Sequence, residues 1–338
     1  MKLRDAVKEY LDLQRSSNMS QYTIDHNRRY LGWFVEWVEE EYHIADVAQL
    51  DVSHLRGWIL HLQQLPLQRG EGILKDSTIR MYGACLRAFC NWLEYEEKVP
   101  KSITKRFKLP KVEKQFIPTF EDEDVKKLLA VCEAEKHYTV KVQRALTARN
   151  RAIVSVLIDT GIRRAELAGL RLCDIDREMR VLLIHRKGNK WQQVPISYEG
   201  FKPLHEYLSK HRADLAAMDG RSVRRKEDMV FLADNGKPLT LMGVSKLFET
   251  LRRRSGIDGK KVTPHQCRRY MATSQLAAGR SPFDVQRQMG HTTLTMTNHY
   301  ASLGIEQLKR SHEQYSPLRK KPDNTTSYGV GMGYWEEE

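Results

Sequence analysis

Tyr300 stands in the stretch MGHTTLTMTNHYA, residues 289–301, nine residues after His291. A tyrosine hydroxyl can attack an electrophile, but its ordinary pKa of about 10 means that a base must take its proton. Cationic groups must also hold the negative charge that the attack develops. Without such partners Tyr300 is simply a packing residue at the edge of a short helix, so its role depends on what the rest of the chain supplies.

The stretch TPHQCRRYMATSQLAAG, residues 263–279, has the signals of a complete helix. Thr263 suits the N-cap, Pro264 the first helical position and Gly279 the stop. His265 and Arg268 would then project from one face of the first turn. A His/Arg pair at a helix N-terminus is a natural phosphate site, although such pairs more often belong to surface networks.

A second arginine occurs in DTGIRRAELAGLRLCDID, residues 159–176. Gly161 is predicted to end one helix, and Arg163 stands at the entry to the next. Glu166, three residues further on, could hold the fork of Arg163 in a fixed orientation toward a phosphate. A plain helical Arg–Glu pair is the simpler alternative.

Two further candidates lie in loops. Lys187 lies in the turn HRKGNK, where a long cationic side chain can reach into a neighbouring groove; an ordinary turn lysine is the alternative. His291 directly follows Gly290, which is predicted to end a helix that Ser281 and Pro282 open.

The elements that must position these residues are mainly helices. Gly188 and Asn189 suit positive φ and predict a hairpin between the strand candidates RVLLIHRKGN and KWQQVPIS. Thr119 is predicted to cap a helix in TFEDEDVKKLLAVC, whose acidic first turn suits the helix dipole. The expected class is mainly α with a small antiparallel β-sheet.

Residues 1–107 are predicted to form a small helical bundle, with Ser20 capping one helix and Asp76 or Ser77 another. The stretch KLPKVEKQFIP, residues 108–118, has two prolines and no apolar period, which predicts an extended linker. Four arginines on the bundle's helices could touch phosphates, although a solvated helix face is the commoner explanation: Arg28, Arg29, Arg80 and Arg87.

The chain has 338 residues and a formal net charge of +13. Residues 1–114 hold 18 Lys and Arg against 16 Asp and Glu, and residues 115–338 hold 38 against 27. The excess favours a polyanionic partner, with a merely soluble basic surface as an equal alternative. No apolar run suits a membrane span or signal peptide, and five scattered cysteines without a CxxC pair predict reduced thiols of a cytoplasmic protein.

Taken in order, the motifs are TGIR with EL three residues later, the lysine of KGNK, HQCR, MGH and the tyrosine. This ordered set resembles the tyrosine recombinase, or phage integrase, family over roughly residues 20–305. The resemblance implies a helical core-binding domain (1–107), a linker (108–118) and an integrase-type α+β catalytic domain (119–305). It also implies that the tail (306–338) packs on a neighbouring subunit, with a frayed terminus as the alternative.

Carried over by position, the resemblance makes Arg163 and Arg268 the two catalytic arginines that would bind the scissile phosphate of DNA. Glu166 matches the acidic residue that braces the first arginine, so Arg164 is the neighbour and not the ligand. His291 matches the histidine that would support the phosphate.

The same resemblance makes Tyr300 the nucleophile that would form a 3′-phosphotyrosine. His265 would accept the phenolic proton, and Lys187 would protonate the leaving 5′ oxygen. Arg269 stands where many members have a histidine, and Met289 replaces the usual leucine. Neither departure removes a catalytic group, so an active enzyme is expected.

The resemblance therefore implies a site-specific DNA recombinase that acts on double-stranded recombination sites as a homotetramer, in the cytoplasm at the nucleoid. One ester is exchanged for another, so neither ATP nor a metal or other cofactor is expected, and the chain has no GxxxxGK[ST] loop. A simple two-domain enzyme without an arm-binding domain is expected. The long tail with its RKK run favours a mobile element, such as a transposable element.

Two alternatives stay open. A type IB topoisomerase uses a similar residue set, but the MGH motif and the core-binding-like first domain argue against it. A DNA-binding regulator without chemistry is the other, and the filling of six catalytic-type positions together argues against that.

Overall fold

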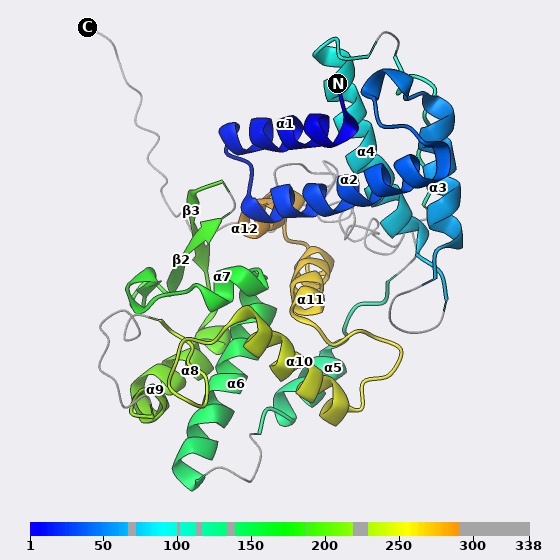
Figure 1. The fold of residues 1–338 in the computed structure, drawn as a ribbon. Coiled ribbons are helices and arrows are strands. Elements are labelled where there is room, and N and C mark those ends of the chain that lie inside the picture. The colour runs from blue at the N-terminus through cyan, green and yellow to red at the C-terminus, as the bar shows by residue number, and fades with distance from the viewer. Residues whose placement is uncertain are drawn as a thin grey trace, which may run out of the picture. The chain divides into compact units, whose positions relative to one another are not determined.

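The computed structural model describes residues 1–66, 72–99, 102–112, 117–133, 139–186, 188–218 and 229–290. The chain divides into two compact units between Phe116 and Ile117. Helices dominate both units, and the second carries a small antiparallel sheet (Figure 1). The expected class, mainly helical with a small sheet, is confirmed.

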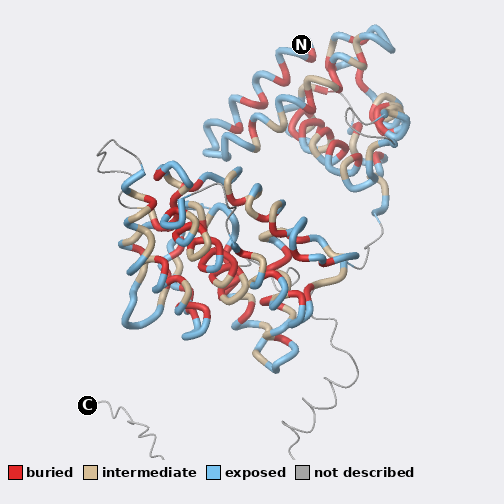
Figure 2. Tube along the Cα trace, turned by 90° about the horizontal axis from the view of Figure 1, so that it is seen from below, coloured by how far each residue is buried: buried red, intermediate tan, exposed pale blue. Residues whose placement is uncertain are grey.

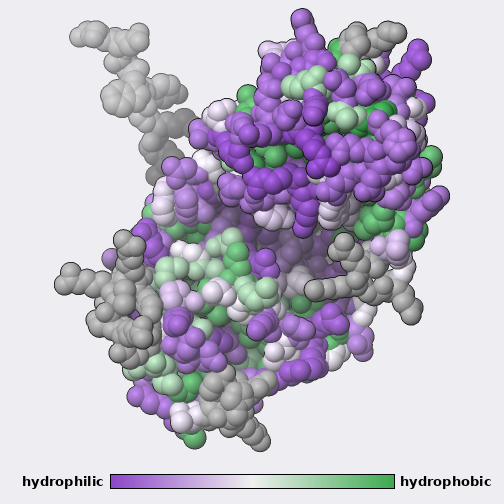
Figure 3. Space-filling view, in the orientation of Figure 1, coloured by the Kyte–Doolittle hydropathy of each residue, from purple (hydrophilic) through white to green (hydrophobic). Residues whose placement is uncertain are grey.

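The first unit is a helical bundle. Phe34 and Phe89 are fully buried in its core, and buried positions line the inner sides of the helices in Figure 2. Hydrophilic residues predominate over this unit on the face that Figure 3 shows, as expected of helices that each bury one apolar stripe. Its α-helices within the described ranges are α1 (Leu3–Ser16), α2 (Gln21–Tyr42), α3 (Val52–Gln64) and α4 (Asp76–Tyr95), and a 3-10 helix (Val47–Gln49) precedes α3.

Of the two predicted helix starts in this unit, one is confirmed. The side chain of Ser20 caps α2 and accepts a hydrogen bond from the amide of Thr23 at 3.2 Å. The other is wrong, because α4 begins at Asp76 and its N-cap is Lys75, so that neither Asp76 nor Ser77 is the cap. Asp76 still favours the helix from within its first turn, where the dipole stabilises a negative charge.

The second unit is built around α6 (Val140–Thr160), which packs against α8 and α11. Ile153, Val154 and Leu157 of α6 are fully buried. The other helices described in this unit are α5 (Asp122–Ala130), α7 (Arg164–Ala168), α8 (Tyr198–Glu206), α9 (Arg212–Ala216), α10 (Leu241–Ser255), α11 (Pro264–Ala277) and α12 (Pro282–Met289), with a π-helical turn (Tyr207–His211) between α8 and α9. No helix in the described ranges is long and apolar enough to cross a membrane.

The start of α5 corrects the prediction of Thr119 as its cap. The N-cap is Glu121, whose amide donates to Asp124 Oδ2 at 2.9 Å in a reciprocal capping box. Lys260 Nζ lies 2.8 Å from Glu121 Oε1 and 2.6 Å from Asp124 Oδ2, which stabilises both carboxylates. Thr119 Oγ1 is buried without a hydrogen-bond partner in the part of the chain that the structure describes.

The predicted hairpin is confirmed. β2 (Val181–Arg186) pairs antiparallel with β3 (Lys190–Pro195), and in the turn Gly188 has φ +83° and Asn189 φ +57°. A two-residue strand, β1 (Ile175–Asp176), extends the sheet along β2. It is too short to show an alternating pattern in the sequence.

Candidate active site

Arg163 is fixed at the start of α7 by the chain on both sides. Gly161 ends α6 with φ +65°, a left-handed conformation that favours glycine, and an added Cβ would also displace the terminal methyl of Met271, 2.1 Å away. Arg163 is the N-cap of α7 in an extended conformation. Glu166 accepts from the amide of Arg163 at 2.7 Å and from its Nη1 at 2.9 Å. The predicted Arg163–Glu166 brace is therefore present.

Glu166 is held by a second arginine that the sequence analysis did not single out. Arg186 Nη1 donates to Glu166 Oε2 at 2.9 Å, and the two side chains are only 6% and 5% exposed. Burial alternates along β2, so Arg186 lies on the same buried face as Leu182 and Ile184. The sequence VLLIHR, with four consecutive apolar residues, does not show this alternation. A charged residue on an apolar strand face needs a buried partner.

Arg268 comes from α11, whose start is as predicted. Thr263 caps the helix by accepting from the amide of Gln266 at 3.2 Å, and Pro264 occupies the first turn. Arg268 is 3% exposed and donates from Nη1 to the main-chain oxygen of Gly161 at 2.5 Å. Its Nη2 donates to the main-chain oxygen of Met289 at 2.7 Å. Arg268 thus joins the end of α6 to the end of α12.

His265 lies one helical turn before Arg268 and is exposed. Nearby protein displaces part of the water around the imidazole, which lowers its pKa below the usual 6.5, and the charges of Arg268, Arg269 and Arg163 lower it further. The lowered pKa makes the neutral ring, which can accept a proton, the dominant form at neutral pH.

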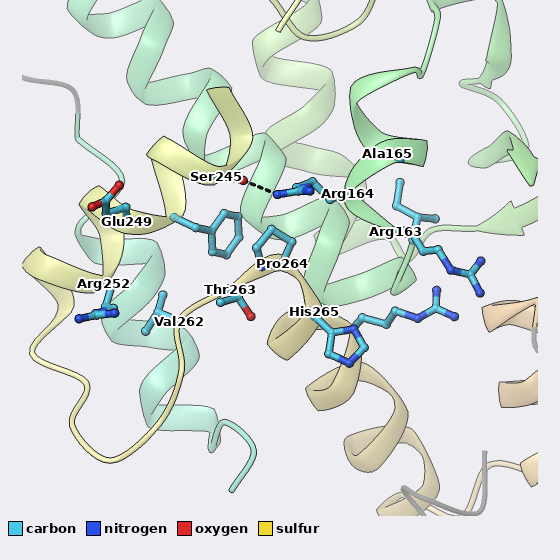
Figure 4. A pocket seen from close by; sticks show the side chains of 13 residues that line it. Arg163, Arg164, Ala165, Ser245, Glu249, Arg252, Val262, Thr263, Pro264 and His265 are labelled. Atoms are coloured by element: carbon cyan, nitrogen blue, oxygen red, sulfur yellow. Dashed lines mark hydrogen bonds between the residues drawn. The ribbon is translucent and has the colours of Figure 1, made fainter. Parts of the chain in front are cut away.

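Arg163, His265 and Arg268 line one cleft of about 880 Å³, which lies between α7, α10 and the start of α11. Arg164 lines it too, but Figure 4 shows its side chain directed toward Ser245 of α10, to which it donates a hydrogen bond, while Arg163 points the other way. The cationic residues in this lining outnumber its acidic ones; they are Arg163, Arg164, Arg252 and Arg268 against Glu249. The cleft therefore suits an anionic ligand.

The C-terminus of α12 is held by three side chains from other elements. Arg186 Nη2 donates to the main-chain oxygen of Gln288 at 2.6 Å, next to the carbonyl of Met289 that Arg268 binds. Gln192 of β3 donates to the preceding carbonyl. These hydrogen bonds satisfy main-chain carbonyls that the end of a helix leaves without partners. The positive charges of the two arginines also interact favourably with the dipole of α12.

Three predicted site residues lie outside the described residues: Lys187, His291 and Tyr300. Their neighbours along the chain are described. Arg186 ends β2 directly before Lys187. Gly290 ends α12 directly before His291 with φ +63°, as predicted. The structure brings together Arg163, His265, Arg268 and Glu166.

The four arginines predicted to contact DNA have partners within the first unit. Arg28 pairs with Asp25 at 2.8 Å, and the guanidinium of Arg29 lies 5.0 Å from the ring centre of Tyr30. Arg80 and Arg87 each donate at 2.7 Å to a main-chain oxygen, of Pro110 and Phe107 respectively. These two arginines hold the segment that leads out of the bundle, and their contact with DNA stays a prediction.

The described residues contain no group of three or more His, Cys, Asp or Glu side chains that could hold a metal ion. All five cysteines are free of disulfides.

Comparison with known families decides what kind of site this is. The sequence pattern of the phage integrase family matches residues 118–321, and that of the phage integrase N-terminal SAM-like domain matches residues 7–98. The chain belongs to the phage integrase family. This is the family of the tyrosine recombinases, enzymes that cleave and rejoin DNA, as the order of motifs predicted.

Relatives of this recombinase match along nearly the whole chain. The chain is 30% identical over 315 residues to tyrosine recombinase XerC of Anoxybacillus flavithermus, and the match covers 93% of this chain and 95% of the relative. It is 27% identical over 316 residues to tyrosine recombinase XerD of Listeria monocytogenes, covering 93% and 99%.

Solved structures share the fold of this recombinase. The Tn1549 transposon integrase in complex with circular intermediate DNA has a TM-score of 0.68 at 19% identity, covering 93% of this chain and 99% of that one. The XerH site-specific recombinase bound to difH substrate, in its post-cleavage complex, has a TM-score of 0.66 at 20% identity, covering 89% and 82%.

Proposed function

We propose that this recombinase cuts one strand of a specific DNA site with Tyr300, while Arg163 and Arg268 bind the scissile phosphate. The observation that carries the proposal is the cleft lined jointly by Arg163, His265 and Arg268, which come from helices about a hundred residues apart in the sequence. The match of the integrase family pattern extends over residues 118–321 and so includes the positions of Lys187, His291 and Tyr300.

The two arginines would contribute to phosphate binding in different ways. Arg163 is 44% exposed, and within the described part of the chain only its amide and Nη1 are held, both by Glu166. Its Nε and Nη2 would face the phosphate as a preorganised fork. Arg268 is buried and held by two carbonyls, so it would supply a fixed positive charge at the cleft wall. Together they would stabilise the charge that develops on the non-bridging oxygens.

Proton transfer would begin at His265. As the oxygen of Tyr300 bonds to phosphorus, its proton would pass to the neutral imidazole, whose lowered pKa keeps it unprotonated at neutral pH. His291, which directly follows Gly290 in the chain, would support the phosphate.

The leaving group would be the 5′ oxygen of the cut strand. The P–O5′ bond breaks as the Tyr300 O–P bond forms, and Lys187 in the hairpin turn would give the departing oxygen its proton. One phosphate diester replaces another, so the bond is conserved without ATP. Reversal with a different 5′ hydroxyl would rejoin the strand to a new partner.

Strand exchange between two duplex sites cuts four strands, and each cut needs its own nucleophile. We therefore propose a homotetramer on two double-stranded recombination sites, acting in the cytoplasm at the nucleoid, with residues 306–338 packing on a neighbouring subunit. Deleting that tail should leave DNA binding intact and abolish assembly; unchanged assembly would contradict this role. We further propose that the enzyme acts for a mobile element, since its fold is similar to that of the Tn1549 transposon integrase.

The chemistry is tested with a suicide DNA site whose nick lets the cut fragment diffuse away. Wild type should form a covalent protein–DNA adduct, and Tyr300→Phe should form none. Tyr198→Phe, at an exposed tyrosine of α8 that does not line the cleft, should behave as wild type. An adduct in the Tyr300→Phe variant, or none in wild type, would overturn the proposal. Joining of two sites, as opposed to relaxation of supercoils alone, then separates a recombinase from a topoisomerase.

A further inference from the structure

Arg186 is a buried arginine with three different acceptors. Its Nη1 donates to Glu166 Oε2 at 2.9 Å, its Nε to Gln192 Oε1 at 3.0 Å and its Nη2 to the main-chain oxygen of Gln288 at 2.6 Å. Its side chain is 6% exposed. Removing a guanidinium from water is costly, so such a residue is tolerated only where its donors are satisfied.

The three acceptors belong to three segments that meet at the candidate site. Glu166 braces Arg163, and Gln192 lies on β3 across the hairpin that carries Lys187. Gln288 lies in the last turn of α12, and a Cβ on Gly290 would come within 2.9 Å of Arg186 Nε. A single guanidinium therefore ties the first arginine, the hairpin and the end of α12 to one another.

Sharing of the Glu166 carboxylate has a direct consequence for Arg163. Glu166 Oε1 accepts from Arg163 Nη1, whereas Oε2 accepts from the amide of Arg163 and from Arg186. Arg186 thus fixes the rotation of the carboxylate and leaves only one of its oxygens to the Arg163 side chain. Without Arg186, the carboxylate would be free to turn and take more of the Arg163 fork, which would draw that fork away from a phosphate.

We propose that Arg186 is a positioning residue that, through Glu166, orients Arg163 toward the scissile phosphate. Arg186 does not itself touch DNA in this role, because each of its nitrogens is engaged and its side chain is buried. The inference rests on the proposed role of Arg163.

The test compares single-turnover cleavage of two suicide substrates. One has an ordinary scissile phosphate, and the other has a methylphosphonate, which is neutral and so needs no orienting of a cation. On the phosphate, Arg186→Met should cleave about 100-fold more slowly than wild type, a size expected when a reacting group is misplaced by about an ångström. On the methylphosphonate, Arg186→Met should cleave within about threefold of the wild-type rate. Arg163→Ala should also cleave that substrate within about threefold of wild type.

Matched variants separate positioning from folding. Arg149→Met removes another buried arginine of the same unit, which donates to Leu232 and Asn150 away from the cleft. It should lower the melting temperature but leave cleavage of both substrates within about threefold of wild type when assayed well below melting. Arg186→Lys keeps the charge without the fork, so it should show a smaller defect that the methylphosphonate also relieves; it replaces Arg186→Met if that variant does not fold.

The failures are distinguishable. Absence of an adduct with wild type contradicts the proposed function itself. Suppose instead that wild type reacts and that the methylphosphonate relieves the cleavage defect of Arg163→Ala. The positioning role of Arg186 alone is then overturned if the Arg186 variants show an equal defect on both substrates, or no defect on the phosphate.

Discussion

Arg268 Nη2 donates to the main-chain oxygen of Met289 at 2.7 Å, across 21 residues of sequence. The same guanidinium binds the oxygen of Gly161 at 2.5 Å, where α6 ends. One side chain therefore ties the segment before Arg163 to the segment before His291. A residue proposed to bind phosphate also holds together the two chain segments that lead to its proposed partners.

Replacing Arg268 should consequently reduce both stability and catalysis. Arg268→Met leaves two buried carbonyls without these donors, which should lower the free energy of unfolding by about 1–3 kcal/mol. It also removes a preorganised charge, which should slow adduct formation by about 10²- to 10³-fold. Urea unfolding and single-turnover cleavage measure the two effects. Normal cleavage by a destabilised protein would restrict Arg268 to a structural role.

Gly290 offers a test of the contact between α12 and Arg186. Its φ is +63°, and an added Cβ would lie 2.9 Å from Arg186 Nε and 3.0 Å from Gln192 Oε1. Gly290→Ala should lose about 1–2 kcal/mol of stability from the left-handed conformation and should also slow cleavage by displacing Arg186. Unfolding curves and adduct yields report the two losses.

Gly256 supplies the matched control for that variant. It ends α10 with φ +61°, and an added Cβ would meet nothing within 4 Å. Gly256→Ala should therefore lower the free energy of unfolding by about as much as Gly290→Ala does. The variant should still cleave DNA at the wild-type rate. If both alanine variants cleave equally well, the packing of Gly290 against Arg186 has no part in the reaction.

The sequence predicted those features whose interactions are local. Thr263 caps α11 through an amide three residues away, and Glu166 braces Arg163 at the same spacing. Such contacts are fixed by helix geometry, so residue types at the right spacing reveal them. The order of motifs then indicated the family, which supplied the fold.

The features that were missed depend on distant partners. Arg186 binds residues 20 and 102 positions away, and no local spacing encodes those contacts. Arg80 and Arg87 each donate to a carbonyl 30 or 20 residues further along the chain, which helical spacing does not reveal, and their contact with DNA stays a prediction. Only the packed unit shows that these guanidinium groups are already engaged.

The pKa of His265 sets a pH dependence for cleavage. Surrounding protein and then the charges of Arg268, Arg269 and Arg163 lower that pKa from the usual 6.5. The neutral base should therefore persist from neutral pH to below 6.5, and the cleavage rate should fall only when acid protonates the ring. By linkage, any contribution of His265 to stability is present above the unfolded-state pKa and is lost as pH falls through the lower folded-state pKa.

Single-turnover rates between pH 5 and 8 check this behaviour, with the ring titrated by NMR in parallel. His265→Gln should abolish the acid limb and cleave slowly at every pH, because the amide cannot take a proton. A wild-type acid limb centred above pH 6.5, or one that persists in His265→Gln, would remove His265 from the role of base.

Glu166 carries the negative charge that two arginines share, and its removal should be more costly than that of a surface acid. Glu166→Gln keeps the size of the side chain but leaves the buried Arg186 without a counter-ion, which should lower the free energy of unfolding by about 3–5 kcal/mol. Asp25→Asn breaks the exposed pair with Arg28 and should cost about 0–1 kcal/mol. Urea unfolding of both variants makes the comparison. Equal losses would mean that Glu166 is no more than a helical surface partner of Arg163. That result would contradict the proposal that Arg186 positions Arg163 through the shared carboxylate.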